Sequence, residues 1–127
     1  MSAQIDHVIV PVVDRDASIA FYETVLGFEH EGEQEPFSVI RVSPTFTMQL
    51  APWGTDGGMH LAFAMTEREF DATFARLRAA GIEDGDSFHA VGNMQGPGVE
   101  GGARGPGAAV YCFDPSRHLV EIRHYGD

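Results

Sequence analysis

The chain has 127 residues, the length of a typical single domain, and 43% of them are hydrophobic, which is enough for a buried core. Its formal net charge is −11, with 19 acidic residues against 8 basic ones, and all of the basic residues are arginine. The absence of lysine excludes Schiff-base catalysis and a lysine-dependent phosphate loop. Because an acidic chain repels phosphate backbones, we expect no nucleic-acid partner.

The single cysteine, Cys112, excludes an intrachain disulfide, which fits a reducing compartment. The first residues lack the basic start and the long apolar stretch of a secretory signal. The longest apolar run, residues 8–13, is too short to cross a bilayer. We therefore expect a cytoplasmic protein whose partner is a small molecule, with no membrane partner.

The first half of the chain predicts one strand, one helix and three further strands. Residues 5–12 are rich in β-branched side chains and predict a strand, in which Pro11 indicates an edge position. A helix is predicted next, with Asp14 or Asp16 as its N-cap and Gly27 just beyond its end. Short strands are predicted at residues 28–32, 37–43 and 46–51.

The second half predicts a similar series. A strand at residues 59–65 leads into a capping-box pattern, with Thr66 at the N-cap and Glu69 three residues later. The helix that follows is expected to stop at Gly81. Further strands are predicted at residues 88–92, 108–113 and 118–124, with a turn at 114–117 between the last two.

The same order of elements therefore occurs twice. His7 and His60 are 53 residues apart, and Gly27 and Gly81 are 54 apart, as expected of an internal repeat. We predict an α+β fold in a single domain, residues 1–127, built from two repeated βαβββ modules at 1–53 and 58–127. The modules are expected to form an open eight-stranded half-barrel cleft with flanking helices. The second module carries an extra glycine-rich loop, residues 93–106, which is either a plain linker or a lid over the cleft.

Side chains of a strand alternate between two faces, and this alternation predicts a polar set on one face. The face turned away from the helices carries His7, Gln49, His60 and Glu121, with the small residues Ala51, Ala62 and Ala64 leaving room for a ligand. Two histidines and one carboxylate on rigid strands form an arrangement that binds a divalent first-row metal with open positions. The equivalent places of His7 and His60 in the repeat favour this interpretation.

Other interpretations of the same residues stay open. An exposed antiparallel face also alternates polar and apolar residues, and Glu121 could instead pair with Arg123 or Arg41. Tyr111 could face the cleft or the core, whereas Cys112 is expected to be an inert buried thiol. The remaining histidines are expected at the surface: His30, His89, His118 and His124.

Several motifs resemble one family, the vicinal oxygen chelate superfamily, which includes glyoxalase I, extradiol dioxygenases, fosfomycin-resistance thiol transferases and bleomycin-resistance proteins. Residues 59–63, MHLAF, are similar to the opening of its second module. The first module opens with IDHV, SIAFY and VLGF at residues 5–8, 18–22 and 25–28, and the closing strand is similar to FDP and HLVEI at 113–115 and 118–122. The resemblance covers essentially the whole chain and is specific for the superfamily, not for one activity.

The resemblance implies metal ligands at His7, His60 and Glu121, for a divalent ion that could be iron, manganese, nickel or zinc. In glyoxalase I a catalytic glutamate lies on the fourth strand, where this chain has Gln49. Because an amide cannot act as a general base, this departure counts against glyoxalase I activity. The remaining ligand set is more similar to that of the dioxygenases and the fosfomycin-resistance enzymes.

The first hypothesis is therefore a metal-dependent lyase, dioxygenase or transferase, in which the metal holds two neighbouring oxygens of a small substrate. Gln49 and Tyr111 are candidates for catalytic roles, and Arg41 and Arg104 for substrate binding. The alternative is a metal-free protein that sequesters a small molecule, as bleomycin-resistance proteins do, and a third is a degenerate copy that serves only dimerisation. A homodimer is expected in every case because exposed sheet edges must pair, and the cleft could be completed within one chain or across two.

Overall fold

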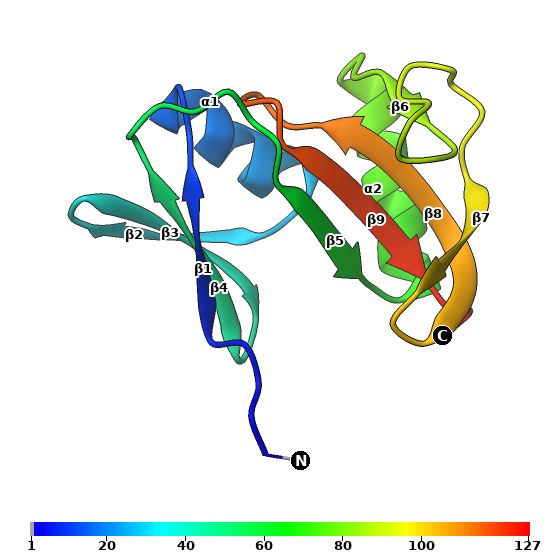
Figure 1. Ribbon diagram of the computed structural model, residues 1–127, viewed down its shortest axis with the longest axis horizontal. Coiled ribbons are helices and arrows are strands. Elements are labelled where there is room, and N and C mark those ends of the chain that lie inside the picture. Colours follow the sequence, from blue (N-terminus) through cyan, green and yellow to red (C-terminus); the bar gives the residue numbers. More distant parts are fainter. Residues whose placement is uncertain (1) are drawn as a thin grey trace. The chain divides into compact units, whose positions relative to one another are not determined.

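A computed structural model describes residues 2–127, which form an α+β fold of two compact units divided between Gly57 and Gly58 (Figure 1). Each unit contains one open sheet and a helical segment, so the predicted fold class is confirmed. Within residues 2–127, the longest helix is too short and too polar to cross a membrane.

The first unit has a sheet of four strands in the order β1-β4-β3-β2, with β1 parallel to β4. As predicted from Pro11, β1 lies at one end of this sheet. The α-helix α1 continues directly into a π-helical turn, η1. In chain order the elements are β1 (His7–Pro11), α1 (Arg15–Ala20), η1 (Phe21–Val25), β2 (Glu29–Gln34), β3 (Phe37–Ser43) and β4 (Phe46–Ala51).

Local signals fix the helical segment of this unit. The Asp14 carboxylate accepts a hydrogen bond from the backbone N–H of Ala17 at 3.0 Å, which satisfies one of the free donors at the helix start. Gly27 has a φ of +77°, a conformation that glycine adopts without strain and that ends the helical path. The core between the helical segment and the sheet includes Val10, Tyr22, Ile40, Met48 and Leu50, all fully buried.

The second unit has a five-stranded sheet in the order β5-β9-β8-β6, and β7 also pairs with β8. Figure 1 shows α2 lying across one face of this sheet. Its elements are β5 (His60–Ala64), α2 (Glu67–Ala79), β6 (Asp84–Gly85), β7 (Gly98–Gly102), β8 (Gly105–Phe113) and β9 (Leu119–His124).

The predicted capping box begins α2. The Thr66 hydroxyl accepts a hydrogen bond from the Glu69 N–H at 3.1 Å and donates one to the Glu69 carboxylate at 2.9 Å. This helix lies against β9. The prediction of an inert thiol is confirmed, because Cys112 is 1% exposed and burial raises its pKa to about 12.

The strand registers show how the two halves of the repeat correspond. His7 and His60 are each the first residue of a strand that runs parallel to the last strand of its own unit. Each histidine pairs with one residue of that last strand. The residue two positions further along the same strand is Gln49 in the first unit and Glu121 in the second. Gln49 and Glu121 are therefore equivalent positions of the repeat.

Two predictions about the strands of the second half are wrong. Residues 88–92 form turns and not a strand, since the N–H groups of Gly92 and Met94 both bond to the Asp84 carbonyl at 2.9 Å. The predicted extra loop contains β7, so residues 2–127 hold nine strands where eight were expected. Glycine has a low strand propensity, and the pairing of β7 with β8 comes from the hairpin and not from local sequence preference.

The predicted turn at residues 114–117 is present and joins β8 to β9. One carboxylate oxygen of Asp114 accepts hydrogen bonds from the N–H groups of Ser116 and His118 at 2.8 and 2.9 Å. The expectation that His118 lies at the surface is wrong, since the residue is fully buried. Its Nδ1 accepts a hydrogen bond from the N–H of Met59 at 3.2 Å, which fastens the start of β5 to this turn.

Replacing Asp114 with alanine should lower the free energy of unfolding by about 1–3 kcal/mol, because two buried N–H groups lose their acceptor. Chemical denaturation followed by circular dichroism measures the change. Asp114→Asn is the matched control, since its amide oxygen can still accept both hydrogen bonds, and it should lose less. Equal loss in the two variants would contradict this account of the turn.

Candidate functional site

A pocket of about 370 Å³ lies on the second sheet, a volume in the range of small-molecule sites. It is formed by residues from β5, from β9 and from the hairpin between β7 and β8. As predicted, Ala62 and Ala64 leave open space there. The lining residues are His60, Ala62, Ala64, Gly101, Gly102, Ala103, Glu121, Arg123 and Tyr125.

His60 and Glu121 meet in this pocket from the neighbouring strands β5 and β9. The distance between His60 Nε2 and Glu121 Oε1 is 2.9 Å. At this distance His60 Nε2 donates a hydrogen bond to the carboxylate, and a divalent ion would have to take the place of the shared proton. Two atoms that bind one metal at about 2.1 Å and at a right angle are also about 3 Å apart, so the pair would need little movement to become adjacent ligands. The His60 side chain is 49% exposed while that of Glu121 is 6% exposed, so an ion could reach the pair from the histidine side.

The other oxygen of Glu121 is bound by Arg123, two residues further along the same face of β9. Arg123 Nη1 donates to Glu121 Oε2 at 2.5 Å, so the alternative pairing with this arginine is present, although both side chains are buried and not on a solvated face. Burial is the largest single effect and lowers the pKa of Arg123, but the hydrogen bonds and negative charges of Glu121 and Tyr125 together outweigh it, so this pKa is raised. Glu121 therefore lies beside a permanent positive charge.

The backbone of the β7–β8 hairpin encloses the rest of the Arg123 side chain, which is 3% exposed. Its two terminal nitrogens donate to the carbonyl groups of Glu100 at 2.9 Å, Gly101 at 3.3 Å and Gly105 at 3.4 Å. A Cβ atom at Gly102 would lie 2.4 Å from Arg123 Cζ, closer than any side chain can approach. The glycines that suggested a linker are thus the residues that let the hairpin close around this arginine.

Tyr111 pairs with Glu121 across β8 and β9 and is 3% exposed. The centre of its ring lies 6.2 Å from that of His60. Burial, and next the negative charge of Glu121, raise the pKa of Tyr111 to about 12. At neutral pH the phenol is therefore protonated and can donate a hydrogen bond, but it cannot serve as a base.

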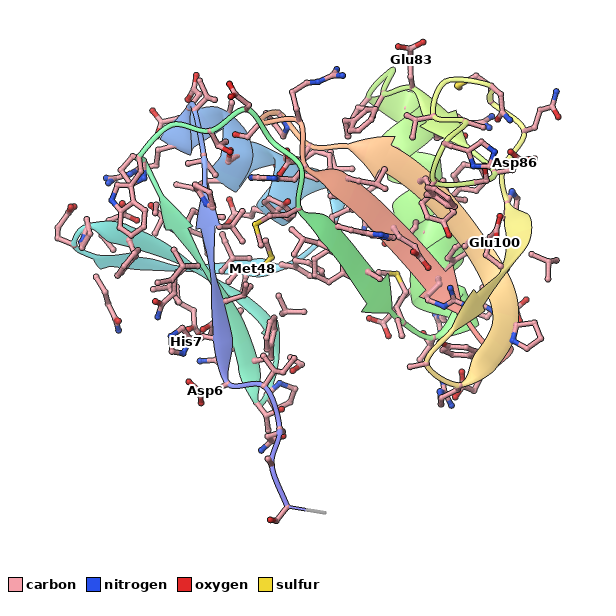
Figure 2. The ribbon with its side chains drawn as sticks, in the orientation of Figure 1. Asp6, His7, Met48, Glu83, Asp86 and Glu100 are labelled. Carbon is pink, nitrogen blue, oxygen red and sulfur yellow. The ribbon has the colours of Figure 1, made fainter. Side chains whose placement is uncertain are left out.

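In the first unit, His7 lies at the start of β1 beside Asp6, and Figure 2 shows the two side chains together. His7 Nδ1 is 2.8 Å from an Asp6 carboxylate oxygen, an arrangement that assigns the proton to Nδ1 and leaves Nε2 as an acceptor. Ligand histidines commonly have such a carboxylate partner. Gln49 lies on the same face of this sheet, and Arg41 pairs across the strands with Thr47 on that face.

Neither arginine predicted to bind substrate is free of an acidic partner. Arg41 donates to both carboxylate oxygens of Glu31, at 3.0 and 3.1 Å. Arg104 lies 3.2 Å from an Asp127 oxygen and stacks over the Tyr125 ring at 4.2 Å. An anionic substrate would have to replace these carboxylates, so binding by either arginine stays a prediction.

The structure thus joins some of the predicted residues and leaves others apart. Among residues 2–127 no group of three or more His, Cys, Asp and Glu side chains is arranged to hold a metal ion. The prediction missed the hairpin contacts of Arg123 and the position of Tyr125, although the alternation through 121, 123 and 125 is a signal for the latter. The second unit holds His60, Tyr111, Glu121 and Arg104, and the first holds His7, Gln49 and Arg41.

Comparison with known proteins gives a family model and similar solved structures. The structure titled "Oxidase ChaP-H2" is 26% identical, has a TM-score of 0.81, and matches over 100% of both chains. Lactoylglutathione lyase from Agrobacterium tumefaciens is 20% identical with a TM-score of 0.68, over 99% of this chain and 96% of that one. The fosfomycin resistance protein FosX from Listeria monocytogenes is 18% identical with a TM-score of 0.70, over 98% and 95%. These last two show likeness of fold alone.

The family model spans residues 4–122, nearly the whole chain, and includes His7, His60 and Glu121. The matched range includes both open sheets and the strands that carry these residues, except for the last two residues of β9. The chain belongs to the Glyoxalase/Bleomycin resistance protein/Dioxygenase superfamily.

Proposed function

We propose that the protein is a metal-dependent enzyme that acts on a small oxygen-rich substrate, with His7, His60 and Glu121 as the metal ligands. The observation that carries the proposal is the 2.9 Å distance between His60 Nε2 and Glu121 Oε1 inside a pocket of suitable volume. Two histidines and one carboxylate suit iron, manganese, nickel or zinc. His7 belongs to the other unit, and could act with the pair of its own chain or with that of a second copy.

A divalent ion bound there would act as a Lewis acid toward two neighbouring oxygens of the substrate. The residues of the chain would orient the substrate and control its protons. The Tyr111 hydroxyl, protonated at neutral pH, would donate a hydrogen bond near His60 and Glu121. Gln49 would orient the substrate through its amide, which can both donate and accept hydrogen bonds without changing charge.

Gln49 also narrows the reaction class. It occupies the position of the repeat that Glu121 has in the second unit, yet it cannot accept a proton. A reaction that needs a second carboxylate as base, as glyoxalase I chemistry does, is therefore disfavoured. The likeness at 26% identity to a protein named an oxidase supports an oxidation reaction over a lyase reaction.

We further propose a cytoplasmic homodimer. β1 and β5 each end the sheet of their own unit, and an end strand presents backbone groups that favour pairing with another strand. The one cysteine is reduced and buried, which fits a reducing compartment.

A second candidate function is supported by the ion pair between Glu121 and Arg123. Because Arg123 already balances the charge of Glu121, the buried carboxylate requires no metal to stabilise it. The pocket could then hold an organic compound against Ala62, Ala64 and the ring of Tyr125. This is the metal-free, sequestering function of bleomycin-resistance proteins.

Elemental analysis of protein purified without an affinity tag distinguishes the two candidates. We expect about one iron, manganese, nickel or zinc ion per site, directly or after reconstitution with each ion. His60→Ala and Glu121→Ala should lose the ion, since each removes a ligand. His89→Ala is the control, because this histidine lies in an exposed turn of the same unit and bonds to Ser87.

Full metal occupancy in folded Glu121→Ala would show that the ligand assignment is wrong. If the wild-type protein binds none of the four ions but does bind organic compounds in a calorimetric screen, the sequestering function replaces the enzymatic one.

Tyr111 should ionise well above the ordinary phenol pKa of 10, with a midpoint of about 12. Absorbance of the phenolate is recorded between pH 9 and 13 for wild type and Tyr111→Phe, and the difference isolates this residue. Because folding raises this pKa, the contribution of Tyr111 to stability is complete below pH 10 and is lost as the pH rises toward 12. A midpoint near 10 in the difference curve would exclude the buried, protonated phenol.

A further inference from the structure

Glu121 presents its two oxygens to different partners. Oε1 is 2.9 Å from His60 Nε2, while Oε2 accepts the hydrogen bond from Arg123 Nη1. We propose that Arg123 is a positioning residue that limits Glu121 to one oxygen toward a bound cation and weakens the binding of that cation by offsetting the carboxylate charge. The inference rests on the proposed function, because it concerns the same ligand.

Arg123 cannot easily leave this position. Both terminal nitrogens also bond to backbone carbonyls of the β7–β8 hairpin, and the side chain is 3% exposed. Gly102 and Gly107 leave the space for it, since a Cβ at either position would come within 3.1 Å of a guanidinium atom. The hairpin therefore fixes the guanidinium, and the guanidinium in turn fixes the carboxylate.

The arginine is particular to the second half of the repeat. Pro11 and Ala64 are the last residues of the equivalent strands β1 and β5. Pro11 pairs with Ala51 and Ala64 pairs with Arg123, so Ala51 is the counterpart of Arg123 in the first unit. The carboxylate and its guanidinium thus occur together in one unit, where the other unit has Gln49 and Ala51. This pairing favours a role of Arg123 toward Glu121 over a general role in the sheet.

The sign of the effect follows from charge. A divalent ion on Oε1 is repelled by a guanidinium bound to the other oxygen of the same carboxylate. Charges a few ångströms apart in partly buried surroundings interact strongly enough to change an affinity by about tenfold or more. A residue that only stabilised the fold would leave the affinity of the folded protein unchanged.

The test is calorimetric titration of the metal-free protein with Co²⁺ and Mn²⁺, with the visible absorption of Co²⁺ as a report on its coordination. Arg123→Met should bind both ions at least about tenfold more tightly. Its Co²⁺ spectrum should change toward higher coordination, as Glu121 binds through both oxygens. Arg123→Lys keeps the charge and should remain within about threefold of wild type.

Gly102→Ala tests the same idea without changing charge. Its Cβ would displace the guanidinium, so binding should tighten in the same direction as in Arg123→Met, and this variant carries the test if Arg123→Met does not fold. Arg68→Met, on the exposed side of α2, is the control for net charge and should bind as wild type does.

The outcomes separate this inference from the proposed function. If wild type and both test variants bind equally, or the test variants bind more weakly, the inference is overturned and the metal site stands. If only Arg123→Met and Gly102→Ala bind an ion, the inference holds and wild type is not the proposed metalloenzyme. If none of the proteins binds either ion, the inference is overturned, and the reconstitution with iron, manganese, nickel and zinc decides the proposed function separately.

Discussion

The Glu121 carboxylate, held between His60 and Arg123, is the interaction on which the candidate site depends. A buried carboxylate is costly unless it is paired, and each partner of Glu121 comes from a different structural feature. His60 is contributed by the neighbouring parallel strand, and Arg123 by the next position on the same face of β9. The register of β5 against β9 is therefore as important to the chemistry as the identity of the residues.

That register is set away from the pocket. The buried carboxylate of Asp114 forms the turn before β9, and the buried His118 ties the turn to the backbone just before His60. On the other face, α2 covers the alternate side chains of the sheet, so a slip of one residue would expose the core and bury the polar face. The apolar and polar faces thus specify one pairing together.

The sequence predicted most of this fold because its signals are local. β3 and β4 begin and end at the predicted residues, and the capping box at Thr66 places α2. Strand alternation also brought His60, Glu121 and the small residue Ala62 to one face, as found. The errors arose where structure depends on distant contacts: β7 exists only through its pairing with β8, and His118 is buried only because the turn folds back on β5. Alternation could name Arg123 as a partner of Glu121, but could not choose between that ion pair and a metal ligand.

The fit of Gly102 against Arg123 has a consequence for how this protein can change over evolution. The position has no need of glycine for its backbone conformation, yet a Cβ there would lie 2.4 Å from both the guanidinium carbon and the Tyr125 hydroxyl. A relative that keeps Arg123 must therefore also keep Gly102. A relative that loses Arg123 is freed from that contact, but the contact with Tyr125 remains. Residues 102 and 123 should covary among relatives, although one lies in a hairpin and the other in the central part of the sheet.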